Sequence, residues 1–334
     1  MDPALVEARY QRALFKGSLD TLLRDFKLRY GERWEEFYKK SEDAYEKDIV
    51  EVERVGEDLI KLVEERIDDV DTAALYSAYG RNLSIEKELE IAMELLGRPG
   101  ALEKLLKWGL VMHFTDDVVT APPYLAKLLL KLTEKAKPPS VELWEELYAI
   151  SNDGAAMALL EGLLTGDLDI QLHQVFYNEV PKNYVFGKLA VYREEVGLVV
   201  NPVLSAEELL EAVLQIKERR ADTLAKALSL HGEYEFNKEI RCGVHYLTID
   251  GTFEKSGVVA ICPWLTYSKS LWRRRQNYVV VLEGKRPRIP MSVKVGVIFI
   301  KGGEAEVVKP STPSKIFDYL VDLLYSVGFL VTES

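Results

Sequence analysis

The sequence predicts an α+β protein of several domains. With 334 residues the chain is too long for one ordinary hydrophobic core and long enough for two or three. Apolar residues recur every three or four positions through most of the chain up to Leu230, which is helical spacing. After Gly232 the spacing changes to the two-residue period of strands, which indicates a C-terminal domain with a sheet.

Residues 1–70 are predicted to be helical. The apolar positions of their second half follow one face and are separated by Glu and Lys; they are Tyr45, Ile49, Val52, Val55, Leu59, Leu62 and Val63. We prefer a helix that packs on its own domain. The alternative is association with a protein partner or a second copy through these N-terminal helices.

Residues 71–137 form the next predicted domain. The helices expected over 72–79, 84–96 and 100–108 precede two short strands, 110–115 and 118–120, and a last helix, 124–135. The segment "LEKLLKWGLVMHFTDDVVTAPP" resembles the recognition helix and wing of the winged helix-turn-helix superfamily. The resemblance implies binding to DNA or to another protein.

A second winged-helix-like domain is expected over 138–204. Helices are predicted over 141–150, 155–164, 169–177 and 182–195, and "EEVGLVVNPVL" then repeats the change from helix to wing strand. Lys182, Lys188 and Arg193 would lie on the presumed recognition helix, where they could reach phosphates or base edges.

Residues 205–334 are predicted to form a nuclease-like α/β domain. A long helix (205–230) precedes strands over 234–240, 243–249 and 258–262, a helix over 268–282, a buried strand over 294–300 and a closing helix over 314–327. Over 205–301 this order resembles the restriction-endonuclease-like, or PD-(D/E)XK, superfamily. That superfamily holds Mg²⁺ with carboxylates from two adjacent strands and uses a lysine beside them.

The nuclease pattern is incomplete in this chain. "HYLTIDG" supplies Asp250 where the resemblance implies the first metal ligand. On the next strand, Ile261 or Cys262 stands where a Glu is implied, and Pro263 or Trp264 stands where a Lys is implied. We therefore expect no enzyme and no cofactor from this domain. Mg²⁺ would be needed only under the alternative of a metal-dependent nuclease with an atypical site around Asp250.

The charge distribution favours a polyanionic partner. The chain carries −11, yet residues 269–301 contain nine basic residues and one acid, a local charge of +8. Nucleic-acid contacts are expected from an arginine-rich helix with aromatic neighbours and from the basic loop after it. The residues are Trp272, Arg273, Arg274, Arg275 and Tyr278, followed by Lys285, Arg286 and Arg288. One alternative is a partner protein with an acidic surface. Another is that this basic helix pairs with the acidic N-terminal helices of the same chain.

Two cysteines, Cys242 and Cys262, are too few for a disulfide framework or a zinc site. We prefer two buried free thiols. The alternative is one disulfide between neighbouring strands, which gains weight because the composition is typical of thermophilic proteins, with few Gln and abundant Glu, Lys and Arg.

Several classes are excluded by missing motifs. The chain has no G-x-x-x-x-G-K-[ST] loop and no G-x-S-x-G elbow, and its four histidines lack ligand spacing. It has no apolar run of membrane-spanning length and no secretory signal, so a cytoplasmic protein without a membrane partner is expected. The predicted function is a nucleic-acid-binding or adaptor protein of a DNA- or RNA-processing or transcription complex. The alternatives are the atypical nuclease and a protein-interaction scaffold.

Overall fold

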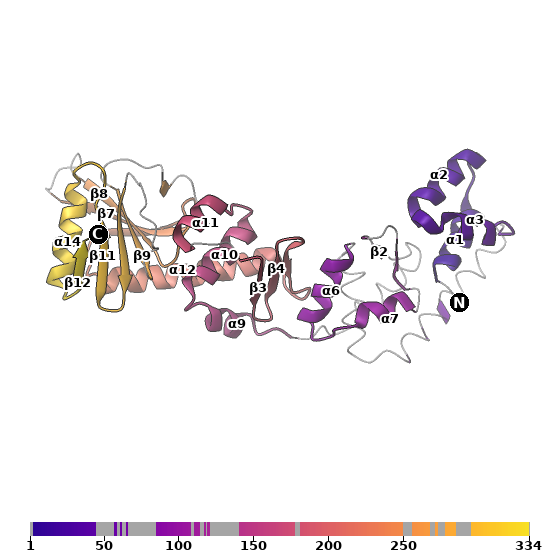
Figure 1. Cartoon of the computed structure of the whole chain (residues 1–334), viewed down its shortest axis with the longest axis horizontal. Helices are drawn as coiled ribbons and strands as arrows, with labels where there is room; N and C mark the ends of the chain where they lie inside the picture. The colour runs from indigo at the N-terminus through magenta and orange to yellow at the C-terminus, as the bar shows by residue number, and fades with distance from the viewer. Residues whose placement is uncertain are drawn as a thin grey trace. The chain divides into compact units, whose positions relative to one another are not determined.

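The computed structural model describes residues 3–44, 57–58, 61, 65, 85–107, 110–113, 117, 119–120, 140–177, 181–249, 256–267, 271–272, 278–284 and 295–333. It is a mixed α+β structure, whose helices and strands are labelled in Figure 1. The chain divides into two compact units. Unit 1 comprises Met1–Val141 and Lys188–Ser205, and unit 2 comprises Glu142–Gly187 and Ala206–Ser334. No helix among the described residues is long and apolar enough to cross a bilayer.

Unit 1 begins with three helices that share an aromatic core. They are α1 (Pro3–Leu14), α2 (Leu19–Tyr30) and α3 (Trp34–Lys40), with a 3₁₀ turn, η1 (Gly31–Arg33), before the last. Phe26 and Tyr30 of α2 and Phe37 of α3 are all buried, and the last two rings meet edge to face with centroids 5.1 Å apart. The helical prediction is thus confirmed where the N-terminal region is described. The apolar stripe of 45–63 falls almost entirely outside the described residues.

The middle of unit 1 follows the predicted order. It contains α6 (Glu86–Leu95), α7 (Ala101–Lys107) and the antiparallel pair β1 (Met112–His113) and β2 (Val119–Thr120). The helices predicted over 72–79 and 124–135 lie outside the described residues.

A second hairpin completes unit 1 and corrects one prediction. Strands β4 (Ala190–Arg193) and β5 (Gly197–Val200) are antiparallel and place Val191 and Val199 against Ile91 of α6. The helix predicted over 182–195 is therefore wrong. Gly187 and Gly197 have positive φ angles of 53° and 95° in the turns on either side of β4, and Val191 and Tyr192 between them are residue types that favour strands.

The helices of unit 2 agree with the prediction. They are α9 (Leu143–Ile150), α10 (Gly154–Thr165), α11 (Ile170–Tyr177) and the long α12 (Ala206–Ala227), with a short strand β3 (Asn183–Phe186) after α11. The Asp153 side chain accepts hydrogen bonds from the backbone N–H groups of Ala155 and Ala156 and so fixes the start of α10. Gly166, in the left-handed region, ends that helix.

A seven-stranded sheet forms the centre of unit 2, with the order β12-β11-β10-β9-β8-β7-β6. Strands β6, β7 and β8 form an antiparallel meander, whereas β8, β9 and β10 are mutually parallel. The bounds are β6 (Glu233–Asn237), β7 (Cys242–Thr248), β8 (Ser256–Cys262), β9 (Tyr278–Glu283), β10 (Gly296–Lys301), β11 (Glu304–Val308) and β12 (Leu330–Glu333).

One face of this sheet carries two helices. Val259, Val279 and Ile298 from the three parallel strands share a core with residues of α12 and of α14 (Lys315–Ser326). Gly296 lets α14 approach closely, because an added Cβ would lie 2.4 Å from Phe317 Cδ2. Helix α11 contacts the other face, where the rings of Phe176 and Phe299 lie 6.3 Å apart.

Two expectations about this domain need correction. The helix predicted over 268–282 is wrong at its C-terminal part, because Tyr278–Glu283 is strand β9; the β-branched run Val279–Val281 favours a buried parallel strand. Free cysteines are also wrong. Cys242 and Cys262 form a disulfide between β7 and β8, with Cα atoms 4.9 Å apart. The alternative interpretation was the right one.

Candidate functional site

Unit 2 has a cavity of about 430 Å³ at the carboxyl ends of its parallel strands. Pro263 and Trp264 follow β8, Glu283 and Gly284 end β9, and Lys301 ends β10; all five line this cavity, which we call the strand-end cavity. Side chains that follow adjacent parallel strands meet at one edge of the sheet, and that edge is the usual ligand site of open α/β sheets.

Two cations from different elements reach the strand-end cavity. Arg220 on α12 contacts Glu283 with Nη2 3.0 Å from Oε2 and also donates to the carbonyl of Ser151. Lys301 is exposed at the end of β10. Arg220 is thereby fixed in place by two acceptors, while Lys301 remains at the solvent-facing rim.

The basic sequence predicted to bind nucleic acid continues from this rim. Lys285 directly follows Gly284, whose N–H donates to the carbonyl of Ile300 at 2.7 Å. The side chains of Lys285, Arg286 and Arg288 lie outside the described residues, as do those of Arg273, Arg274 and Arg275. In the chain, the basic residues 285–288 follow β9, and the arginines 273–275 precede it.

Trp272 and Tyr278 do not form the exposed aromatic face that the sequence suggested. The Trp272 indole N–H donates to the carbonyl of Thr266 at 3.0 Å, and its ring lies 5.4 Å from that of Phe176. Tyr278 is 6% exposed at the start of β9. Tyr278 therefore lies on strand β9 and not on the predicted helix, and Trp272 is half-buried against Phe176.

The other predicted contacts are placed on strands and turns. Lys182 is exposed just before β3, and Lys188 is exposed in the turn before β4. Arg193 ends β4 and forms an ion pair with Glu94 of α6 at 3.1 Å. Since no helix spans these positions, they do not form a recognition helix. Lys182 also belongs to unit 2, whereas the other two belong to unit 1.

A buried charged cluster contacts Trp264, which lines the strand-end cavity. Glu161 of α10 is 1% exposed, and its Oε2 accepts hydrogen bonds from Lys217 Nζ and from the Trp264 indole N–H, both at 2.6 Å. Burial lowers the pKa of Lys217, and the neighbouring Glu161 carboxylate opposes that effect. Arg241 places its Nε 3.4 Å from the second oxygen of Glu161.

Sequence reasoning missed this cluster, although one signal was available. Glu161 interrupts the otherwise apolar helix sequence "GAAMALLEGLLT", and an acid in that setting requires a buried partner. Its partners come from three other segments, so their identity could not be read from spacing.

Metal binding is not supported within the described residues. They contain no group of three or more His, Cys, Asp or Glu side chains that could hold a metal ion. Asp250, the catalytic and metal-binding candidate of the nuclease alternative, lies outside them.

No protein-family model, curated protein or solved structure matches the chain. The class defined by the geometry is therefore an α+β protein with a mixed sheet and a cavity at the carboxyl ends of its parallel strands.

Proposed function

We propose that this protein binds nucleic acid, and that unit 2 holds the phosphate backbone at the strand-end cavity. One observation carries the proposal: Arg220 and Lys301 reach this cavity, and the run Lys285-Arg286-Pro287-Arg288 leaves from its rim. Cations from separate segments that gather at one edge suit a ligand with repeated negative charges. The protein would act as a binding or adaptor component of a nucleic-acid-processing or transcription complex.

The proposal also includes a finer reading of the two folds. The order α12, β6, β7, β8 and a parallel β9 supports a restriction-endonuclease-like core in unit 2. The strand that follows β8 is β9, rather than the expected strand over 294–300. The order α6, α7 and a β1–β2 hairpin supports a winged helix over residues 71–137.

The test is a salt-titrated binding assay with labelled single- and double-stranded oligonucleotides, read by fluorescence anisotropy. For a phosphate-backbone contact, the affinity of the wild-type protein should fall steeply between about 50 and about 200 mM salt. Changing Lys285, Arg286 and Arg288 together to Glu should weaken binding at least about tenfold. The slope of log affinity against log salt concentration should fall by an amount equivalent to about two to three phosphate contacts.

Two variants serve as controls. Changing Arg273, Arg274 and Arg275 to Glu reverses the same number of charges on the other side of β9 in the sequence, and we expect a smaller loss. Lys226→Glu reverses an exposed cation of α12, whose side chain is 75% exposed, and should leave affinity unchanged. Absence of binding to every oligonucleotide, or an equal loss in all three variants, would overturn the proposal. Cleavage with Mn²⁺ that disappears in Asp250→Ala would replace it with a metal-dependent nuclease.

A further inference from the structure

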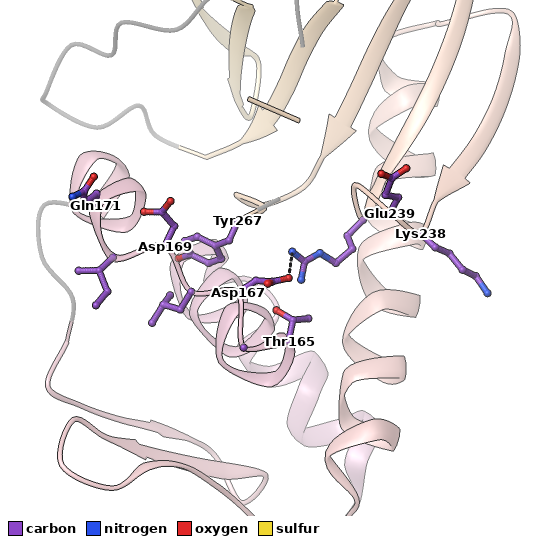
Figure 2. A pocket seen from close by; sticks show the side chains of 11 residues that line it. Thr165, Asp167, Asp169, Gln171, Lys238, Glu239 and Tyr267 are labelled. Carbon is purple, nitrogen blue, oxygen red and sulfur yellow. Dashed lines mark hydrogen bonds and ion pairs between the residues drawn. The ribbon is translucent and has the colours of Figure 1, made fainter. Parts of the chain in front are cut away.

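A second and larger cavity lies elsewhere in unit 2, between the α10–α11 loop and the turn that joins β6 to β7 (Figure 2). Its volume is about 920 Å³, which is enough for a small organic molecule. Asp167, Asp169 and Tyr267 approach it from one side, and Lys238 and Glu239 come from the hairpin turn, with the Lys238 side chain extending away from the group (Figure 2). We call it the Arg241 cavity after the buried arginine in its lining.

Arg241 is held in an unusual backbone conformation that directs it inward. Its φ angle is 57°, in the left-handed region that residues other than Gly seldom adopt. The preceding turn is fixed by Asn237, whose side-chain oxygen accepts the backbone N–H groups of Glu239 and Ile240, both at 3.0 Å. Strain of this kind is tolerated where the surroundings require it, and it is found at ligand sites.

Two of the three guanidinium nitrogens of Arg241 contact carboxylates. Its Nε lies 3.4 Å from Glu161 Oε1, and its Nη2 lies 3.3 Å from Asp167 Oδ2, the ion pair drawn dashed in Figure 2. Within the described part of the chain, no acceptor faces its Nη1 group. The side chain is 8% exposed, so this donor belongs to a buried group that lines the cavity.

Tyr267 is a second residue of the cavity lining that carries a donor. Its hydroxyl is buried and has no hydrogen-bond partner among the described residues, although buried hydroxyls are normally satisfied. Burial raises the pKa of this phenol above its ordinary value, so the hydroxyl stays protonated. The Tyr267 ring is fixed by packing on two sides. It stacks on the His173 ring with centroids 6.2 Å apart, and it lies so close to Gly162 that a Cβ added there would collide with it.

Acceptors complete the lining. The Asp167 carboxylate is 62% exposed beside Arg241, and Glu239 is exposed on the opposite wall. A simple anion without donors would meet these carboxylates unfavourably. A ligand that joins an anionic group to hydroxyl groups would satisfy both kinds of lining.

We propose that the Arg241 cavity binds a small polyhydroxylated anion. The anionic group of the ligand accepts hydrogen bonds from Arg241 Nη1 and from the Tyr267 hydroxyl. The hydroxyl groups of the ligand donate to the Asp167 carboxylate. The anionic group is a phosphate or a carboxylate, since the guanidinium fork recognises both. The site is separate from the strand-end cavity, and it does not depend on nucleic-acid binding.

The test uses calorimetric titration of the full chain with four probes: ribose 5-phosphate, gluconate, neutral ribose and inorganic phosphate. Ribose 5-phosphate or gluconate should bind, and whichever is tighter identifies the anionic group. Ribose and inorganic phosphate should bind at least about tenfold more weakly, because each lacks one of the two kinds of contact.

Variants locate the binding. Tyr267→Phe and Asp167→Asn should each weaken it about tenfold, as expected for the loss of a hydrogen bond to a charged group. Tyr319→Phe, which removes an exposed hydroxyl of α14, should leave it unchanged. Without ligand, Tyr267→Phe should keep the wild-type melting temperature, because the hydroxyl has no partner in the folded protein. Failure of both anionic probes to bind, affinities that ignore the two cavity variants, or a melting temperature lowered by Tyr267→Phe would each overturn the proposal.

Discussion

Lys217 Nζ lies 2.6 Å from Glu161 Oε2, and the two side chains are 0% and 1% exposed. The same carboxylate accepts the indole N–H of Trp264, which lines the strand-end cavity, and faces Arg241, which lines the other. One buried acid thus fixes a wall of each cavity. Removing one member of the cluster leaves its partners charged, buried and unpaired. Such a change destabilises a protein more than replacing the whole cluster with apolar residues.

We predict that Glu161→Gln destabilises unit 2 by about 3 to 5 kcal/mol, since it leaves the buried Lys217 ammonium without a counter-charge. The loss should appear as a lower melting temperature of unit 2 in calorimetry. Glu211→Gln, an exposed acid of α12, is the control and should change stability by less than about 0.5 kcal/mol.

The double variant Glu161→Leu with Lys217→Met sharpens this prediction. Replacing both charges with apolar groups of similar size should recover a large part of the stability lost in Glu161→Gln, because no unpaired ammonium remains. A double variant as unstable as the single one would show that packing, rather than charge, dominates at this position.

The disulfide gives a second prediction. Changing Cys242 and Cys262 together to Ala should destabilise unit 2 by about 3 kcal/mol, the value expected for a closed loop of this length, since the two residues are 20 apart. A thiol reductant under denaturing conditions should lower the stability of the wild type in the same way. It should have no effect on the double variant, and a reductant effect there would mean that the disulfide is not the cause.

Much of the helical architecture could be predicted from the sequence, for a physical reason. Helices such as α12 and α14 carry one apolar face at a 3.6-residue spacing, which local sequence displays. Strand β9 could not be separated from a helix in the same way. Its buried run Val279–Leu282 is apolar at every position, so the pattern lacks a period, and the basic residues before it suggested an exposed helix.

The two cavities depend on contacts that spacing does not encode. Arg241, Asp167 and Tyr267 come from a hairpin turn, a helix connection and the segment after β8, so only the folded chain brings them together. The disulfide shows the same limit. From the sequence, two cysteines separated by 20 residues favoured free thiols, and only the pairing of β7 with β8 brings them together as a disulfide.

A third prediction concerns pH. His245 on β7 is 5% exposed, and burial lowers its pKa below 6.5, with Asp222 opposing the shift. The unfolded chain therefore takes up this proton first as the pH falls. Stability should drop as the pH decreases below 6.5 and stop dropping from this source once the folded pKa is passed.

The measurement compares melting temperatures from about pH 8 to about pH 5. His245→Phe should show a weaker acid-induced loss than the wild type, because this variant has no proton to take up. His231→Gln, an exposed histidine in the same unit, should follow the wild-type curve. Identical curves for His245→Phe and the wild type would contradict the assignment.

The last prediction tests how closely α14 packs on the sheet. In Gly296→Ala the new Cβ would lie 2.4 Å from Phe317 Cδ2, so the ring or the helix must move, at a cost of about 1 to 3 kcal/mol. Gly303→Ala, at a position with no atom within 4 Å of the added Cβ, is the matched control and should be nearly neutral. Adding Phe317→Leu to Gly296→Ala should lose less stability than the sum of the two single changes, because the smaller side chain makes room for the methyl group. Strict additivity would mean that α14 already shifts freely, and the close approach at Gly296 would then not position the helix.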